Sequence, residues 1–318
     1  RLFQGLACIA LSLALAACAN PGAPPGADHG GRPPLLVISI DGYRADYIQR
    51  GLSLTLASMA ADGVHAVAMQ PAFPSLTFPN HYTLVTGLYP DHHGIVANHM
   101  VDPRLGTFNY TDHVAVTDGR WWDGGEPIWV SAERRGLKTA TMFWPGSEAR
   151  IHGYRPDHAP RYQGKITPNQ RVDQVLAWLD LPPAQRPDFL TLYFDRVDHA
   201  GHDHGPDSPQ VNGALRLIDA AMQRLVTGLE ARGLYRHMNI IVVSDHGMAP
   251  ASAQRVTYLD ALLPAGSFRA VSLGQSAGVV PLEGHDAEVA KVLLAKRPHM
   301  TCWRKGDIPK RLHYGSNP

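Results

Sequence analysis

The sequence predicts an α/β fold built on a doubly wound, mostly parallel sheet that is flanked by helices and carries loop insertions. Short apolar runs typical of buried strands alternate along the chain with segments typical of helices. Polar side chains come directly after several of these runs. This pattern is typical of open parallel sheets, whose binding sites lie at the carboxyl ends of the strands. The composition is globular, with 44% hydrophobic and 18% charged residues, and 318 residues suffice for one large α/β domain or two small ones.

Four apolar runs predict the strands. Leu35–Ile40 is continuously apolar, as expected of a strand buried on both faces of a parallel sheet. Residues 139–144, Phe189–Phe194 and 239–244 form three more runs of the same kind.

Helices are predicted over residues 45–61 and 209–232. In the second segment, apolar side chains step by three and four positions and so share one helix face: Val211, Leu215, Ile218, Met222, Leu225 and Leu229. Asp207 or Ser208 is expected to cap this helix, with Pro209 in its first turn.

The stretch 91–170 is irregular and rich in Trp, Tyr, Gly and Pro. We expect one strand and one helix of the main fold there, with long loops that cover the site. Its aromatic residues either pack in the fold or stack on a substrate: Tyr110, Trp121, Trp122, Tyr154 and Tyr162.

The N-terminal residues have the pattern of a targeting segment. Residues 5–17 are apolar but too short for a stable membrane anchor, and the run that ends at Cys18 resembles the lipobox of bacterial lipoproteins. Residues 19–34 follow as a Pro/Gly-rich tether. We therefore expect residues 1–18 to be a lipoprotein-type signal of an exported bacterial protein, periplasmic or anchored by a lipid on Cys18. An ordinary secretory signal with a chance Cys is the alternative.

Cysteine usage argues against an internal disulfide, and the net charge argues against a nucleic-acid-binding patch. Cys8 lies in the apolar segment and Cys18 would be acylated, which leaves Cys302 without a partner, so no internal disulfide is expected. The formal net charge of +1 gives no strong basic field, so no nucleic-acid-binding patch is predicted.

Aspartate and histidine side chains follow the predicted strands. Asp41 follows the first strand, Asp198 and His202 lie just after the third, and Asp245-His246 follows the fourth. Zinc takes His nitrogen and carboxylate oxygen as ligands, and several buried carboxylates gathered at one edge need a cation. The neighbouring Asp195, His199, Asp203 and His204 are expected to have supporting or surface roles.

Thr77 lies at or just before the start of a predicted helix. Pro79 suits a first helical turn, and residues 80–86 continue as a helix. The free N–H groups and the dipole at a helix start favour a phosphate, and a hydroxyl placed there can attack phosphorus. Taken alone, Thr77 could equally be a helix cap.

Five motifs resemble one family. Residues 38–44 (Ile-Ser-Ile-Asp-Gly-Tyr-Arg), 73–81 (Phe-Pro-Ser-Leu-Thr-Phe-Pro-Asn-His) and 86–95 are similar to the nucleotide pyrophosphatase/phosphodiesterase family of the alkaline phosphatase superfamily. Asp198-x-x-Gly201-His202 and residues 244–248 match later motifs of that family in order. The resemblance covers residues 35–318 and implies an alkaline phosphatase-like phosphodiesterase domain.

This resemblance implies two zinc ions and a set of substrate contacts. One zinc would be held by Asp41, Thr77, Asp245 and His246, and the other by Asp198 and His202. Asn98 would donate to a non-bridging phosphate oxygen. Phe78 would stack on a nucleobase, with Tyr162 as the candidate for the opposite face.

The sequence departs from the family pattern at one point. The second zinc of the family takes a further His from a Gly-x-His-Gly motif, which does not occur here, although the region of His313 is similar to the segment that precedes it. We therefore expect the chain to be incomplete at its C-terminus and its second zinc site to have two protein ligands.

The implied activity is hydrolysis of small nucleotide phosphodiesters and pyrophosphates to nucleoside 5′-monophosphates through a phospho-threonine on Thr77. A neutral Asn98, where a monoesterase would usually place a cation, suits a diester. Two alternatives stay open: a choline-type phosphodiesterase of the same superfamily, and a truncated lipoprotein that binds nucleotide without catalysis.

Overall fold

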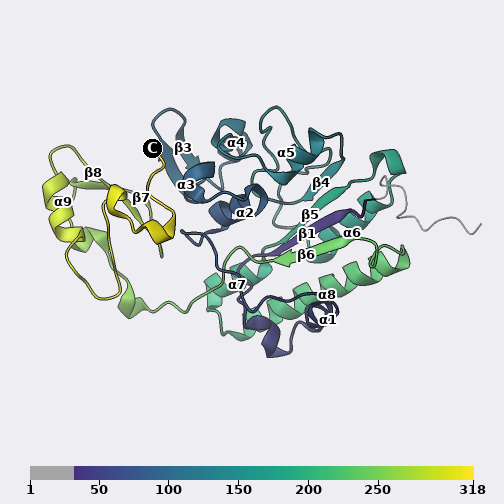
Figure 1. Cartoon of the computed structure of the whole chain (residues 1–318). Coiled ribbons are helices and arrows are strands. Elements are labelled where there is room, and N and C mark those ends of the chain that lie inside the picture. The colour runs from purple at the N-terminus through teal and green to yellow at the C-terminus, as the bar shows by residue number, and fades with distance from the viewer. Residues whose placement is uncertain (1–31) are drawn as a thin grey trace, which may run out of the picture.

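The computed structural model describes residues 32–318, and its core is a parallel sheet of four strands in the order β4-β5-β1-β6 (Figure 1). The strands are β1 (Leu35–Ile40), β4 (Thr139–Met142), β5 (Phe189–Phe194) and β6 (Asn239–Val243). All four predicted strands are confirmed, although the second and fourth end slightly earlier than expected. Residues 1–31, and with them the predicted lipid anchor at Cys18, lie outside the described residues.

Helices cover both faces of this sheet, which confirms the doubly wound α/β architecture. On one face, α1 (Leu54–Asp62), α6 (Pro168–Leu179), α7 (Arg196–His204) and α8 (Pro209–Ala231) enclose a core with β1 and β5. On the other face lie α2 (Thr77–Thr86), α3 (Pro90–His93), α4 (His113–Thr117) and α5 (Ile128–Glu133), as Figure 1 shows. This second core is rich in aromatic side chains, notably Phe108, Trp121, Trp122 and Trp129.

The register of the sheet aligns the carboxyl ends of three strands. Ile40 pairs with Phe194 across β1 and β5, and Ser39 pairs with Val243 across β1 and β6. Residues that directly follow these strands therefore meet at one edge, as the sequence predicts.

The predicted helix over residues 45–61 is confirmed only for its second half, residues 54–61. The chain forms a 3-10 turn at Tyr47–Arg50 and then α1, and Gly51 separates them with a left-handed φ of 69°. The free backbone N–H groups at the start of α1 find their hydrogen-bond partner on another helix. The Asp219 carboxylate of α8 accepts from the N–H groups of Thr55 (3.0 Å) and Leu56 (3.1 Å). A cap supplied by a distant helix leaves no trace in the local pattern.

Helix α8 confirms the clearest helix prediction. Ser208 is its cap, since its hydroxyl accepts from the Val211 N–H, and Pro209 lies in the first turn. Asp207 instead binds Arg44 and Arg50.

The segment 91–170 is more regular than predicted. Besides β4 it holds an antiparallel hairpin of β2 (His99–Asp102) and β3 (Gly106–Asn109) and the short helices α4 and α5. Trp121 and Trp122 are buried and pack in the core, whereas three tyrosines of this segment are partly exposed: Tyr110, Tyr154 and Tyr162.

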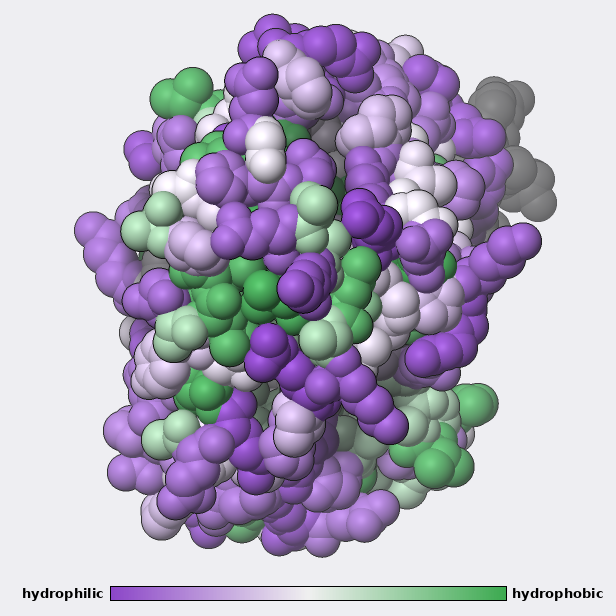
Figure 2. Space-filling view, turned by 90° about the vertical axis from the view of Figure 1, so that its left-hand side faces the viewer, coloured by the Kyte–Doolittle hydropathy of each residue, from purple (hydrophilic) through white to green (hydrophobic). Residues whose placement is uncertain are grey.

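The last part of the chain folds beyond the carboxyl ends of the strands (Figure 1). It contains the hairpin of β7 (Phe268–Ser272) and β8 (Gly278–Pro281), helix α9 (Asp286–Leu293) and several 3-10 turns. Its final residues attach to α3, because Asp91 accepts from the N–H groups of Gly315 and Ser316. Figure 2 views this side and shows an apolar patch among polar residues. Within residues 32–318, none of the helices has the length and apolar character that a membrane span requires.

Candidate active site

Three aspartates converge at the carboxyl edge of the sheet. Asp41 directly follows β1, Asp245 lies just after β6, and Asp198 lies in the first turn of α7, after β5. All three are buried, with at most 8% of each residue exposed. Gly42 permits this approach, because a Cβ there would lie 3.0 Å from the Asp198 Cα, and because its φ of 66° is left-handed.

Two histidines adjoin these carboxylates. His246 Nε2 lies 3.1 Å from Asp245 Oδ2 and 3.5 Å from Asp41 Oδ1. His202 Nε2 lies 3.3 Å from Asp198 Oδ1, one helical turn away. The side chain of His202 is 64% exposed, so the site opens to solvent on that side. The structure thus brings together the predicted metal-ligating Asp and His residues.

The donor set fits a bound cation. Asp41 Oδ1, Asp198 Oδ1 and Asp245 Oδ2 are buried without a hydrogen-bond partner, and such atoms are costly unless a positive charge offsets them. Burial, with repulsion from Asp245 and Asp198, raises the pKa of Asp41 well above its usual value. Burial likewise raises the pKa of Asp245 to about 7.

Two overlapping groups have the spacing of metal ligands. One group is Asp41, His81 and Asp245, and the other is Asp41, Asp198 and His246, each with its ligand atoms within 4.8 Å of one another. Asp41 belongs to both groups. Neither group coincides with a ligand set that the resemblance implies, because one contains His81 and the other combines Asp198 with His246.

Thr77 is the first residue of α2, which confirms its predicted place at a helix start. Its Oγ1 lies 3.4 Å from His246 Nε2 and so faces the metal-ligating residues. The loop before it is fixed by the buried Asn80, whose amide donates to the carbonyls of Pro74 (3.0 Å) and Leu76 (3.1 Å). The hydroxyl is therefore held where free helical N–H groups converge.

Asn98 lies beside this helix start. Its Oδ1 accepts from the backbone N–H of Phe78 at 3.0 Å, so its amide nitrogen is oriented away from that bond. This arrangement leaves a neutral N–H donor next to Thr77, as the predicted contact with a phosphate oxygen requires.

The two predicted stacking residues have different surroundings. The Phe78 ring contacts Phe108, Tyr110 and Trp122 with centroids 5.7 to 6.1 Å apart. Tyr162 lies edge-on to Phe143 at 5.1 Å, and its hydroxyl donates to Asp195 Oδ2 at 2.5 Å. Their contact with a nucleobase stays a prediction.

A buried ion pair holds Tyr162 in place. Arg171 and Asp195 are 1% and 2% exposed, and Arg171 Nη2 lies 2.9 Å from Asp195 Oδ2. Asp195 thus has the supporting role that the sequence predicts, while three other charged residues of α7 are exposed: His199, Asp203 and His204.

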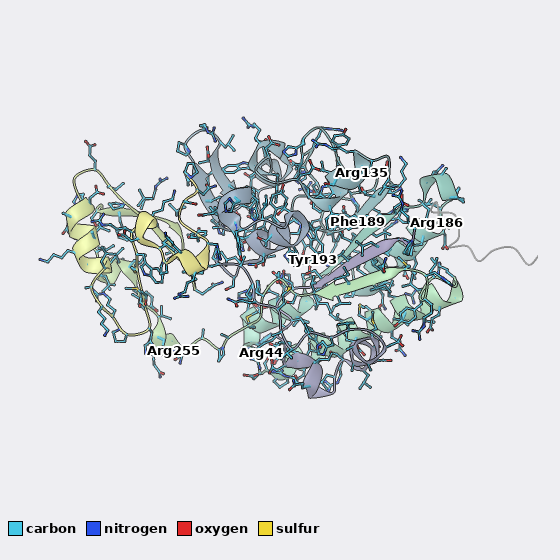
Figure 3. All side chains as sticks on the ribbon, in the orientation of Figure 1. Arg44, Arg135, Arg186, Phe189, Tyr193 and Arg255 are labelled. Atoms are coloured by element: carbon cyan, nitrogen blue, oxygen red, sulfur yellow. The ribbon has the colours of Figure 1, made fainter. Side chains whose placement is uncertain are left out.

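Sequence analysis missed two buried residues at the site, Tyr193 and His81. Tyr193, labelled in Figure 3, donates from its hydroxyl to Asp41 Oδ2 at 2.6 Å. Because Tyr193 lies inside an apolar strand run, its pattern is that of a core residue. His81 belongs to a motif that was recognised, but nothing in the local pattern distinguishes it from its neighbours.

His81 is committed to hydrogen bonds on both ring nitrogens. Nδ1 lies 2.8 Å from the Thr77 carbonyl oxygen, which can only accept, so Nδ1 donates and Nε2 accepts from the Ser39 hydroxyl at 2.8 Å. Burial lowers the pKa of His81 to about 3, so the ring is neutral. These bonds favour a supporting role for His81 over metal ligation, although its Nδ1 is 3.4 Å from Asp245 Oδ2.

Known proteins share this fold and these motifs. The family model described as type I phosphodiesterase / nucleotide pyrophosphatase matches residues 35–318. An uncharacterised pyrophosphatase/phosphodiesterase of Schizosaccharomyces pombe is 42% identical over 292 residues, which cover 89% of this chain and 60% of the relative. Ectonucleotide pyrophosphatase/phosphodiesterase family member 3 of Mus musculus is 38% identical over 95% of this chain and 36% of its own length. The chain therefore spans only part of these relatives.

A solved structure gives the same result. Murine ectonucleotide pyrophosphatase/phosphodiesterase 5, an inactive threonine-to-alanine variant in complex with AMP, superposes with a TM-score of 0.86 at 34% identity. The match covers 90% of this chain and 76% of that protein. With its motifs, its sheet and its site geometry in agreement, the chain belongs to the type I phosphodiesterase / nucleotide pyrophosphatase family.

Proposed function

We propose that this chain hydrolyses nucleotide phosphodiesters and pyrophosphates to nucleoside 5′-monophosphates through a covalent phospho-threonine. The observation that carries this proposal is the placement of the Thr77 hydroxyl at a helix start, 3.4 Å from His246 and beside buried carboxylates. A solved relative supports it, because the murine protein in complex with AMP is an inactive threonine-to-alanine variant.

We infer that the Asp, His and Thr side chains at this edge bind two zinc ions. Asp41, Thr77, Asp245 and His246 would hold one, and Asp198 and His202 would hold the other. When bound, such ions favour ionisation of a hydroxyl or water and offset charge on phosphoryl oxygens. Mixed histidine and carboxylate donors match zinc better than magnesium or calcium, which prefer oxygen alone.

The residues of the chain then have defined tasks. The Thr77 hydroxyl gives up its proton, and its oxygen attacks phosphorus. The bond from phosphorus to the leaving oxygen breaks, the leaving group departs with that proton, and a phospho-threonine diester results. A water molecule then attacks the same phosphorus: its oxygen stays on the released nucleoside 5′-monophosphate, and one of its protons goes to the Thr77 oxygen. The Asn98 amide and the N–H of Thr77 donate to the non-bridging oxygens, where charge accumulates in each step.

Supporting residues keep these groups in place without touching substrate. The Tyr193 hydroxyl holds Asp41 by donating to its Oδ2, and His81 Nδ1 holds the Thr77 backbone by donating to its carbonyl. Asn80 fixes the loop that leads to Thr77. Such outer contacts orient ligands and nucleophile before substrate arrives.

The test uses one leaving group in two substrates. A nitrophenyl ester of a nucleotide is compared with nitrophenyl phosphate, with and without a chelator. We expect a strong preference for the diester, loss of activity with chelator, and loss in Thr77→Ala. Thr83→Ala is the matched control, because Thr83 lies in the same helix and contacts His93 away from the site.

Four results would contradict parts of this proposal. Full diesterase activity in Thr77→Ala excludes the nucleophile, and a preference for the monoester excludes the diesterase. Retained nucleotide binding without turnover in the wild type favours the non-catalytic alternative. A choline diester cleaved faster than the nucleotide diester favours the choline-type alternative.

We also propose that the protein is exported and lipid-anchored at Cys18. The support is the lipobox-like run that ends at Cys18 and the Pro/Gly-rich stretch that follows it. Mass spectrometry of the mature protein should show an acylated Cys18 at the N-terminus. Cys18→Ser should abolish both acylation and membrane association, and an unmodified, uncleaved wild type would exclude the anchor.

A further inference from the structure

An open cavity of about 390 Å³ lies between α4 and the loop that leads to Tyr162. Three arginines contribute to its lining, and Glu148 is the only carboxylate among the lining residues: His113, Thr117, Glu148, Arg150, Arg155 and Arg161. Its volume lies within the range of small-ligand sites. We call this space the arginine cavity.

The arginines of this cavity lack carboxylate partners within the described part of the chain. Arg150 and Arg155 each place one guanidinium nitrogen 2.9 Å from a backbone carbonyl, that of Gly153 and that of Ala159 respectively. These bonds orient the guanidinium groups and leave their other N–H groups free. By contrast, eight arginines elsewhere in residues 32–318 form ion pairs within 3.0 Å of Asp or Glu: Arg44, Arg50, Arg120, Arg134, Arg171, Arg224, Arg232 and Arg236.

Glu148 does not neutralise this charge. Its Oε1 accepts from the Tyr162 backbone N–H at 3.0 Å, and its Oε2 lies 3.7 Å from His113 Nδ1. Since the formal charge of the whole chain is only +1, the excess at the cavity is local. Guanidinium groups gathered without counter-charges suit the planar, two-pronged recognition of phosphate.

Tyr162 links the arginine cavity to the candidate active site. Arg161 precedes Tyr162, whose backbone N–H contacts Glu148 in the cavity wall. The hydroxyl at the other end of Tyr162 contacts Asp195, directly after β5 and three residues before Asp198. One tyrosine side chain therefore spans the distance from the cavity wall to the carboxyl edge of the sheet.

We propose that the arginine cavity binds a phosphate group on the sugar of the nucleotide substrate, so that the enzyme favours nucleotides with a second phosphate on the ribose. This assignment rests on the proposed function and on the predicted contact of Tyr162 with the nucleobase. The cavity would select between substrates by the charge on their sugar, and the reaction at the scissile phosphorus would be the same for all of them.

The experiment compares two chromogenic substrates, the nitrophenyl ester of thymidine 5′-phosphate with and without a 3′-phosphate. We expect the wild type to show a kcat/KM about tenfold higher for the 3′-phosphorylated ester at low salt, equivalent to about 1.4 kcal/mol of added binding. The preference should shrink as sodium chloride is raised, because salt screens exposed charges. Arg155→Gln combined with Arg161→Gln should abolish it.

Arg135→Gln is the matched control. Arg135, labelled in Figure 3, is exposed, donates to the Ser131 carbonyl at 2.8 Å and does not line the arginine cavity. Its substitution should leave the preference intact. Circular dichroism confirms folding of each variant, and the exposed positions of the arginines spare the core.

Two outcomes would overturn the inference while leaving the proposed function standing. In one, the wild type cleaves both esters with equal kcat/KM. In the other, the preference survives in the double arginine variant. An effect of inorganic phosphate on the unphosphorylated ester that disappears in the double variant, without any substrate preference, would assign the cavity to free phosphate instead. Failure to cleave either ester would contradict the proposed function itself.

Discussion

The hydroxyl of Tyr193 donates to Asp41 Oδ2 at 2.6 Å, and both side chains are buried. This bond fixes one oxygen of the carboxylate and leaves the other, Oδ1, without a hydrogen-bond partner, 3.5 Å from His246 Nε2. A strand residue of β5 thus orients a ligand that follows β1.

Tyr193→Phe should weaken metal binding about 10- to 100-fold, the usual cost of losing an outer contact to a ligand. Metal affinity is measured by competition with a chromogenic chelator, independently of activity. Tyr47→Phe is the control, because Tyr47 is also buried but donates to the backbone carbonyl of Pro206, which is not a proposed ligand. Equal affinities in the two variants would refute the orienting role.

His81→Asn should retain more activity than His81→Leu. The Asn amide nitrogen can replace Nδ1 as the donor to the Thr77 carbonyl, whereas Leu fills similar volume without a donor. We expect kcat to differ by about tenfold between the variants, the equivalent of about one hydrogen bond. Metal content that falls equally in both variants, with no rescue by Asn, would instead make His81 a ligand.

Asn98→Asp should reduce kcat for diesters more than Asn98→Ala, for which a loss of about 10²-fold is expected. The Asp carboxylate can still accept from the Phe78 N–H, so the local structure is retained. It replaces a donor to the phosphate by a negative charge, and repulsion from the substrate follows. Steady-state kinetics decide, and an Asp variant as active as wild type would exclude the contact.

The Arg171–Asp195 pair should produce an acid-dependent loss of stability. Although burial opposes ionisation, Arg171 and Tyr162 hold the pKa of Asp195 below its usual value of 3.8. An ionised Asp195 therefore stabilises the fold above the unfolded pKa, and this contribution is lost as the pH falls through the lower folded pKa. Denaturant unfolding at several pH values measures the effect.

Asp195→Asn should flatten that decline below about pH 4, since a neutral amide does not titrate. Asp173→Asn is the comparison, because Asp173 pairs with Arg224 at an exposed position where ion pairs contribute little. A decline of identical slope in wild type and Asp195→Asn would contradict this account.

The strands of the sheet, and the site at their carboxyl ends, could be predicted from local patterns in the sequence. Each strand is a short apolar run, and the predicted Asp and His ligands lie in the segments that follow strand ends, so parallel pairing alone brings Asp41 and Asp245 together. The helix start at Thr77 was equally local, since a Pro in the first turn marks it.

Other features depend on contacts that no local pattern encodes. After the break at Gly51, α1 is capped by Asp219, a residue of α8. Tyr193 and His81 look like core residues until the fold places Asp41 and Thr77 against them. Long-range contacts of this kind outweigh local propensity.

The register of β1 with both neighbours has a consequence for the lifetime of the folded state. Gly42 N–H contacts Asp245 across 203 residues of sequence, so the edge forms only when distant segments have already paired. A ligand held there binds only the fully paired sheet and stabilises it by mass action. Amide hydrogen exchange should therefore slow in β1, β5 and β6 together when a metal ion occupies the site. Adding a chelator should speed up exchange in all three strands again.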